Sequence, residues 1–213
     1  MTNHLILGAT GLIGRKLVNQ LSLSKKTIAL TRRKINDLPS NVSELLIDFD
    51  SSLEDISFPH CEHLYICLGT TIKKAGSKDE FKKVDFNYCA SIAEKVLEKG
   101  AKQISLVSSV GANANSNNFY LKIKGMLIKK IVSMKFETIN IYQPGLLIGK
   151  REENRFFEGI MQKMAFLIDP LFIGEMNKYR SISADSIALH MTKSKIKGIN
   201  YFHYGDIMND LKN

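Results

Sequence analysis

The sequence has no tryptophan, only three cysteines and four prolines, and no apolar run near the roughly 20 residues that cross a bilayer. We therefore expect no membrane partner. Cys61, Cys67 and Cys89 are odd in number, lack metal-ligand spacing and lie in apolar surroundings, which predicts reduced thiols in the cytoplasm. No basic segment with a cleavage site opens the chain, so no signal peptide is expected. The histidines are scattered without metal-ligand spacing, and we expect no metal site.

Acidic residues are in the minority, with 21 against 30 lysines and arginines and a formal charge of +9. The basic residues are spread over the chain, and no Lys/Arg block alternates with aromatic residues as a single-strand binder would need. A solvated basic surface explains this better than a nucleic-acid partner. A content of 44% hydrophobic and 24% charged residues is typical of globular proteins.

Strand-like and helical segments alternate along the chain, which is typical of a parallel sheet covered on both faces. The strand-like segments are His4–Gly8, Thr27–Thr31, Glu44–Ile47, His63–Leu68, Gln103–Ser108 and Thr138–Gln143, and the helical ones are Leu12–Ser22, Asp79–Lys99 and Phe119–Met134. No repeat or linker interrupts them, which predicts one α/β domain over residues 1–213. Beyond about residue 145, Gly159–Phe166, Ser181–Ser183 and Asp185–Lys193 are shorter elements that predict a small cap on the substrate side.

A glycine motif, Gly8-Ala9-Thr10-Gly11-Leu12-Ile13-Gly14, joins the first strand to the first helix. At such a junction the unpaired N–H groups of the helix attract a phosphate. The first two glycines let the backbone approach a pyrophosphate, and the third lets the helix pack on the strand. We therefore expect a doubly wound, mostly parallel Rossmann sheet that binds a dinucleotide through Gly8, Thr10, Gly11, Leu12 and Ile13. A purely structural glycine turn is the alternative.

The end of the second strand separates the two nicotinamide cofactors. An acidic residue there binds the ribose hydroxyls of NAD, whereas arginine binds the 2′-phosphate of NADP. The sequence has Arg32 and Arg33 at this point, which favours NADP(H) over NAD(H). A solvated basic loop is the alternative.

Two further strand ends are candidates for cofactor contacts because they meet at the same edge of a parallel sheet. Asp48 could accept a hydrogen bond from the adenine amino group, with Phe49 beside the ring. Leu68, Gly69 and Thr70 would let the backbone pass close to the ribose. Ordinary loop residues are the alternative in each case.

The residues that suggest catalysis follow the fifth strand. Ser108 and Ser109 end that strand, and Tyr120 and Lys124 stand four residues apart on one helix face. A nearby ammonium favours the phenolate, so that a tyrosine can exchange a proton with a carbonyl or an alcohol near neutral pH. The alternative is a surface aromatic–lysine pair.

These features resemble the short-chain dehydrogenase/reductase superfamily, specifically the atypical branch that contains the human Tat-interacting oxidoreductase-like protein and bacterial relatives. The resemblance lies in GATGLIG, CLGTTIKKAGSKDEFKKVDFNY, SLVSSVGAN, YLKIKG and QPGLLIGKREENR. It implies that Tyr120 and Lys124 are the catalytic pair, that Ser109 or the adjoining Ser108 supports them, and that Lys124 also holds the nicotinamide ribose.

Further expectations come from the same resemblance. Pro144 and Gly145 would lead into contacts with the nicotinamide, and Asn87 would support the active site unless it is only a surface residue. The implied function is an NADP(H)-dependent oxidoreductase acting on a small carbonyl or alcohol. The branch also includes proteins that bind cofactor as regulators or chaperones, so a non-catalytic NADP(H)-binding regulator or assembly factor with a protein partner is the rival. We expect a monomer or a homodimer.

Overall fold

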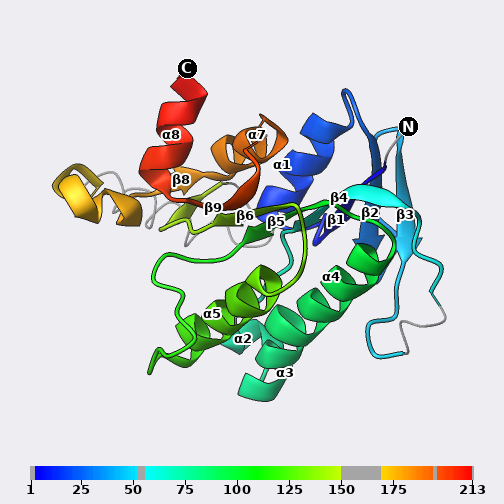
Figure 1. Ribbon diagram of the computed structural model, residues 1–213, viewed down its shortest axis with the longest axis horizontal. Helices are drawn as coiled ribbons and strands as arrows, with labels where there is room; N and C mark the ends of the chain where they lie inside the picture. Colours follow the sequence, from blue (N-terminus) through cyan, green and yellow to red (C-terminus); the bar gives the residue numbers. More distant parts are fainter. Residues whose placement is uncertain (1–2, 52–55, 150–168, 194–195, 213) are drawn as a thin grey trace.

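The computed structural model of the protein describes residues 3–51, 56–149, 169–193 and 196–212. A parallel sheet of seven strands runs through the molecule in the order β3-β2-β1-β4-β5-β6-β9 (Figure 1). Its strands are β1 (Asn3–Leu7), β2 (Lys26–Thr31), β3 (Val42–Leu46), β4 (Cys61–Ile66), β5 (Gln103–Val107), β6 (Thr138–Tyr142) and β9 (Gly198–Phe202). A second small sheet pairs β7 (Leu147–Ile148) with β8 (Ile182–Ser183), also in parallel.

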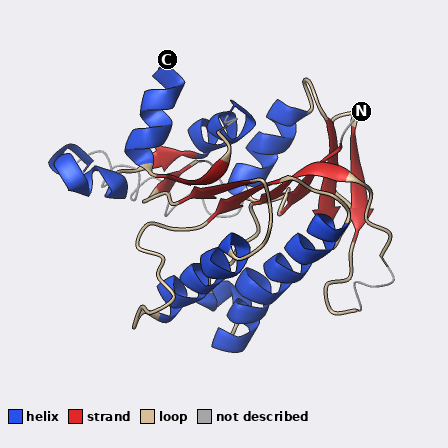
Figure 2. Ribbon diagram, in the orientation of Figure 1, coloured by secondary structure: helices blue, strands red, loops and turns tan. Residues whose placement is uncertain are grey.

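The helices cover both faces of the sheet (Figure 2). The α-helices are α1 (Leu12–Leu21), α2 (Ile72–Ala75), α3 (Lys78–Lys82), α4 (Cys89–Glu98), α5 (Phe119–Val132), α7 (Ala184–Lys193) and α8 (Tyr204–Lys212). A π-helical segment, η2 (Lys83–Tyr88), joins α3 to α4. Two 3₁₀ segments, η3 (Asp169–Leu171) and η4 (Gly174–Tyr179), precede β8.

Two hydrophobic cores follow from the alternation of side chains along the strands. On β6, Ile139 and Ile141 face the core beneath α4 and α5, whereas Tyr142 faces the core beneath α1 and α7. Because both faces are covered, the central strands consist of almost continuous buried apolar residues. This double covering confirms the doubly wound α/β fold expected from the sequence.

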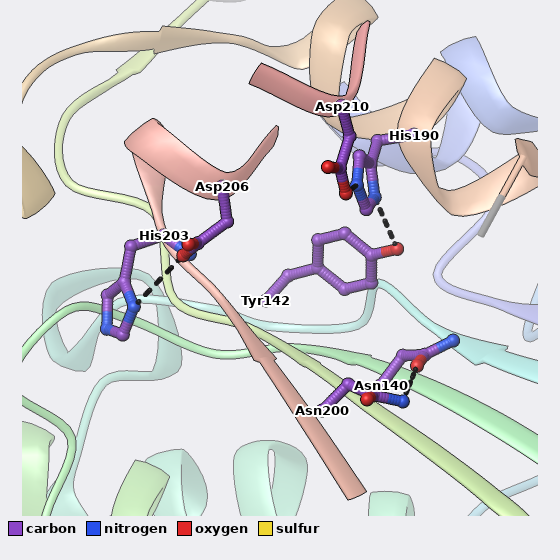
Figure 3. Close-up of polar contacts among 7 residues, drawn as sticks. All are labelled: Asn140, Tyr142, His190, Asn200, His203, Asp206 and Asp210. Carbon is purple, nitrogen blue, oxygen red and sulfur yellow. Dashed lines mark hydrogen bonds and ion pairs between the residues drawn. The ribbon is translucent and has the colours of Figure 1, made fainter. Parts of the chain in front are cut away.

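Buried polar contacts tie the C-terminal elements to the sheet (Figure 3). The Tyr142 hydroxyl lies 3.0 Å from Nδ1 of His190 on α7, and Nε2 of that histidine lies 2.9 Å from an Asp210 carboxylate oxygen on α8. On the neighbouring strands, the Asn200 amide donates to the Asn140 side-chain oxygen at 3.0 Å. Tyr142 and Asn140 are completely buried, so these contacts fix the place of β9, α7 and α8 relative to β6.

Some elements differ from the sequence-based expectations. The segment expected as one helix over Asp79–Lys99 is α3, η2 and α4 in succession, and the third strand lies at Val42–Leu46. The chain after residue 145 contributes β9 to the main sheet and α7 and α8 to one face, in addition to the small β7–β8 sheet. The helix expected at Gly159–Phe166 lies outside the described residues.

Candidate functional site

The order of the strands defines where a ligand is expected. From β1 the chain proceeds outward to β2 and β3, and then returns to the other side of β1 to form β4, β5, β6 and β9. The connections therefore diverge between β1 and β4, and open α/β sheets bind ligands at such a point, beyond the carboxyl ends of the strands. The glycine motif follows β1 at this position, and Leu68–Thr70 follows β4.

Steric limits explain the first and last glycines of the motif. Gly8 has φ +90°, and a Cβ atom there would lie 2.4 Å from the backbone nitrogen of Leu68. A Cβ on Gly14 would lie 2.1 Å from the Gly8 oxygen, so no larger residue fits at this position in the first turn of α1. The motif therefore brings the β1–α1 turn against the end of β4 as closely as the backbone allows.

The start of α1 fits a bound phosphate. The residue that caps the helix is Gly11, which has no side chain to accept a hydrogen bond from the first turn, and that turn contains no acidic residue. Gly11 itself donates to the Gly8 oxygen at 3.0 Å, which closes the turn. The N–H groups of Leu12 and Ile13 are thus without a side-chain cap, and the positive end of the helix dipole faces the crevice.

The residues expected at the adenine end lie on the β1–β2–β3 side. Arg32 and Arg33 are exposed directly after β2, where the Thr31 hydroxyl donates to the Arg33 carbonyl oxygen at 2.8 Å. Asp48 is exposed after β3 and accepts from the Asp50 backbone N–H at 3.0 Å. The Phe49 ring lies 5.0 Å from the ring of Tyr88 and packs against the core. The two arginine side chains are therefore free to turn toward a phosphate, whereas Phe49 already has a packing role.

The β4 end is joined to the catalytic candidates through one buried carboxylate. Asp85, on η2, has no exposed surface, and its Oδ2 accepts from the backbone N–H of Thr70 at 2.9 Å. Its Oδ1 lies 2.7 Å from Nζ of Lys124 on α5. A Cβ on Gly69 would lie 3.3 Å from both charged atoms, so the backbone passes directly beside this ion pair.

The Lys124 ammonium stays charged in this position. Burial acts to lower the pKa of Lys124, but the Asp85 carboxylate and the neighbouring Tyr120 outweigh it, and the pKa is raised above its usual value. Cys89 on α4 also lies near enough to contribute. The arrangement fixes a positive charge next to the phenol of Tyr120, one helical turn earlier on α5.

Tyr120 is held from its other side by an aromatic contact. Its ring lies 5.6 Å from the fully buried ring of Phe81 on α3, which also lies 6.0 Å from that of Phe119. The side chain of Asn118 caps α5 by accepting from the Leu121 N–H at 3.2 Å. The start of α5 and α3 therefore position the phenol together.

The serines and the Pro-Gly pair lie on neighbouring strand ends. Ser108 is buried, and its hydroxyl has no hydrogen-bond partner among the described residues, whereas the Ser109 hydroxyl donates to the Val110 oxygen at 3.4 Å. The backbone N–H of Val110 donates to the Pro144 oxygen at 2.9 Å, and Gly145 follows at the end of β6. The structure brings these residues to one edge of the sheet, and their catalytic and cofactor roles stay predictions.

Sequence reasoning overlooked Asp85. It pointed instead to Asn87, which is exposed. In a regular α-helix residues two apart face different directions, and the π-helical widening of η2 changes the register just where Asp85 turns inward. The local sequence KVDFNY contains no signal that reveals this change of register.

Comparison with known proteins places the chain in a family. It is 34% identical over 165 residues to Protein HTATIP2 of Rattus norvegicus, which covers 74% of this chain and 68% of the relative. It is 40% identical over 157 residues to the mitochondrial protein FMP52 of Candida albicans, which covers 70% and 69%. The chain belongs to the HTATIP2-like branch of the atypical short-chain dehydrogenase/reductases. No family model matches it.

Solved structures with low sequence identity share the fold of this chain. A putative NAD-dependent epimerase/dehydratase from Bacillus halodurans superimposes with a TM-score of 0.71 at 17% identity, covering 100% of this chain and 99% of the other. The human epimerase family protein SDR39U1 with NADPH gives a TM-score of 0.64 at 15% identity, covering 95% and 74%. These likenesses confirm the Rossmann-type fold, and the superfamily is one of nucleotide-dependent oxidoreductases.

The expectation of a cytoplasmic location is wrong, because it conflicts with the names of related proteins. The related FMP52 proteins of Candida albicans and Lodderomyces elongisporus are named mitochondrial. The free cysteines do not indicate a compartment. Burial raises the pKa of Cys61, Cys67 and Cys89 to about 12, which keeps these thiols protonated and disfavours their oxidation in any compartment. In the part of the chain that the structure describes, no helix is long and apolar enough to span a bilayer.

Proposed function

We propose that the protein is an NADP(H)-dependent oxidoreductase that acts on a small carbonyl compound or alcohol. The observation that supports this most is the arrangement of Tyr120 beside the Lys124 ammonium, which the buried Asp85 carboxylate holds at 2.7 Å. A phenol next to a fixed cation, at the carboxyl edge of a parallel sheet, is suited to proton exchange with a carbonyl oxygen.

The proposed cofactor site fits a nicotinamide dinucleotide. The Gly8–Gly14 turn and the uncapped start of α1 would hold the pyrophosphate, with Thr10, Leu12 and Ile13 supplying backbone contacts. Asp48 and Phe49 would lie at the adenine, Leu68, Gly69 and Thr70 at the ribose, and Pro144 and Gly145 at the nicotinamide. When bound, the nicotinamide would supply or accept the hydride.

In reduction, Tyr120 would give its proton to the substrate oxygen as that oxygen gains negative charge, and Ser109 or Ser108 would donate a hydrogen bond to the same atom. Lys124 would stabilise the resulting phenolate and hold the ribose hydroxyls. The proton on Tyr120 would then be restored from solvent, and oxidation of an alcohol would use the same groups in reverse. Asp85 would keep Lys124 in place and charged throughout.

The preference for NADP(H) depends on Arg32, with Arg33 beside it. Both are exposed after β2, and no acidic residue stands at the end of that strand. Solved structures with a similar fold contain either cofactor: MoeE5 is in complex with UDP-glucuronic acid and NAD, whereas human SDR39U1 is with NADPH. The arginines of this chain are what favour the phosphorylated form.

The experiment measures NADPH oxidation by the purified protein with a panel of aldehydes, ketones and quinones. We expect turnover of at least one class. Tight NADPH binding without turnover across the panel would instead support the rival function, a cofactor-binding regulator or assembly factor.

A further inference from the structure

Arg180 directly follows η4, and its guanidinium forms no ion pair with a carboxylate in the described part of the chain. Its Nε atom is buried and has no hydrogen-bond partner there. Its guanidinium lies over the ring of Tyr204, 5.0 Å from the centroid. An arginine normally directs its fork of donors to a carboxylate or a phosphate, so a buried donor without an acceptor needs an explanation.

The acidic residues of the adjoining elements η3 and α8, Asp169 and Asp206, are already engaged. Asp169 accepts from the backbone N–H of Ser181 at 3.0 Å and also from the Ser181 hydroxyl. Asp206 accepts from the backbone N–H of His203 at 2.8 Å and faces that histidine (Figure 3). Both carboxylates are therefore committed to local contacts and form no ion pair with Arg180.

A second orphaned polar atom lies in the same turn. The carbonyl oxygen of Asn177 accepts from the Arg180 backbone N–H at 3.1 Å, while its side-chain Oδ1 is buried and has no hydrogen-bond partner among the described residues. The Asn177 side chain also lies close to Gly205 at the start of α8, where an added Cβ would be 3.1 Å from the Asn177 Nδ2 atom. Arg180 and Asn177 thus leave one buried donor and one buried acceptor unsatisfied within four residues, and of the two only the Arg180 donor group suits an anion.

The position of Arg180 follows from contacts along the carboxyl edge of the sheet. Gln143 donates to the Ser109 oxygen at 3.4 Å, which joins the ends of β6 and β5. A Cβ on Gly145 would lie 2.7 Å from the Arg180 oxygen. The backbone of Arg180 thus lies against the proposed nicotinamide residues at the end of β6, the edge of the sheet at which the substrate is expected.

We propose that Arg180 binds an anionic group of the substrate, a carboxylate or a phosphate. This inference rests on the proposed function and narrows its substrate class to small carbonyl compounds or alcohols that carry a negative charge. Tyr204 supports the guanidinium face, which leaves the terminal NH₂ groups for the anion.

The test compares succinic semialdehyde with butanal, which has the same chain length but no carboxylate. For wild type, kcat/KM should favour succinic semialdehyde. Arg180→Gln should reduce kcat/KM for that substrate about ten- to hundredfold, the usual range for one charged hydrogen-bonding group, and change it little for butanal. Lys178→Gln is the matched control, because it removes an equal charge two residues away, where the ammonium lies 5.5 Å from the Tyr179 ring. It should leave both values nearly unchanged.

Binding gives a readout that needs no turnover. Succinate and, in a separate experiment, inorganic phosphate are titrated calorimetrically into the complex of the protein with NADP⁺. At least one of the two anions should bind to wild type and to Lys178→Gln but not to Arg180→Gln. The anion that binds identifies the carboxylate or the phosphate as the recognised group.

The outcomes separate this inference from the proposed function. Turnover of butanal as efficient as that of succinic semialdehyde, unchanged by Arg180→Gln, overturns the anion site and leaves the oxidoreductase standing. Anion binding that requires Arg180, without turnover of any compound, supports the site and overturns the catalytic proposal. If wild type neither binds these anions nor prefers the charged aldehyde, the inference is wrong.

Discussion

Asp85 Oδ1 and Lys124 Nζ lie 2.7 Å apart in a buried ion pair that joins η2 to α5, while the other carboxylate oxygen of Asp85 holds the backbone of Thr70. The Asp85 carboxylate thus links the end of β4, which is expected to lie at the nicotinamide ribose, with Lys124, which is expected to bind the ribose hydroxyls. Removing either partner would leave a buried charge uncompensated, which typically costs more than the intact pair contributes.

Asp85→Asn should therefore lower the free energy of unfolding by about 3–5 kcal/mol at pH 7, because Lys124 would remain buried without its counter-charge. In the wild type the pKa of Lys124 is raised above the lysine value of 10.5. The charged lysine therefore stabilises the folded state fully below pH 10.5, and this stability is lost as the pH rises through the folded-state pKa. In the variant, burial alone would lower that pKa, so the deficit should shrink as pH rises toward 10.5. Urea unfolding at pH 7 and pH 10 measures both effects.

Glu94→Gln is the control for this prediction. It breaks a partly exposed ion pair between Glu94 and Lys130, which joins α4 to α5. Such surface pairs contribute about 1 kcal/mol or less. Equal stability losses in the two variants would show that the Asp85–Lys124 pair has no special role.

Gly8→Ala should abolish tight cofactor binding and destabilise the protein, because the new methyl would lie 2.4 Å from the Leu68 backbone nitrogen at a residue with φ +90°. Gly76→Ala separates the two causes. Gly76 has nearly the same φ, +89°, but nothing lies within 4 Å of its Cβ position. The control should cost only about 1–2 kcal/mol, the penalty for a left-handed backbone. Thermal unfolding with and without NADPH checks both variants, and a Gly8→Ala protein as stable as Gly76→Ala would contradict the steric account.

The glycine motif and the Tyr120–Lys124 spacing could be interpreted from the sequence because both depend on local geometry: a turn between a strand and a helix, and one helix face. Asp85 and Arg180 could not. Asp85 turns inward through the π-helical register of η2, and Arg180 comes to lie beside Gly145 through a backbone contact between residues far apart in the sequence. The strand β9 was overlooked because its outer residues, Ile199 and Tyr201, are exposed at the sheet edge and give it no alternating pattern with a polar face.

Arg32→Ala should weaken NADPH binding about tenfold or more and leave NADH binding unchanged, because only NADPH offers a 2′-phosphate to the guanidinium. Lys26→Ala, at the opposite, amino end of β2, is a control for the general loss of one positive charge. Calorimetry with both cofactors makes the comparison. Tighter NADH than NADPH binding by the wild type, or equal weakening for both cofactors in Arg32→Ala, would remove the 2′-phosphate argument.

Mild acid should destabilise the protein through a buried histidine. Burial, with a smaller effect of His4, lowers the pKa of His63 to about 3, and its Nε2 lies 2.9 Å from the hydroxyl of the buried Ser105. The unfolded chain takes up the proton near pH 6.5, so stability falls as pH falls below that value, by about 2 kcal/mol at pH 5. Denaturation between pH 7 and pH 5 measures the slope. His63→Gln should flatten it, whereas the exposed His60→Gln should not, and identical slopes in all three proteins would refute the assignment.

The most direct test of the catalytic proposal is NADPH oxidation by wild type and Tyr120→Phe, with the same carbonyl substrate and with NADPH affinity measured in parallel. The substitution removes the hydroxyl and keeps the ring that packs against Phe81. We predict a loss in kcat on the order of 10²–10⁴ with almost unchanged NADPH affinity, because the hydroxyl acts on the substrate. Turnover by Tyr120→Phe at the wild-type rate would contradict the account.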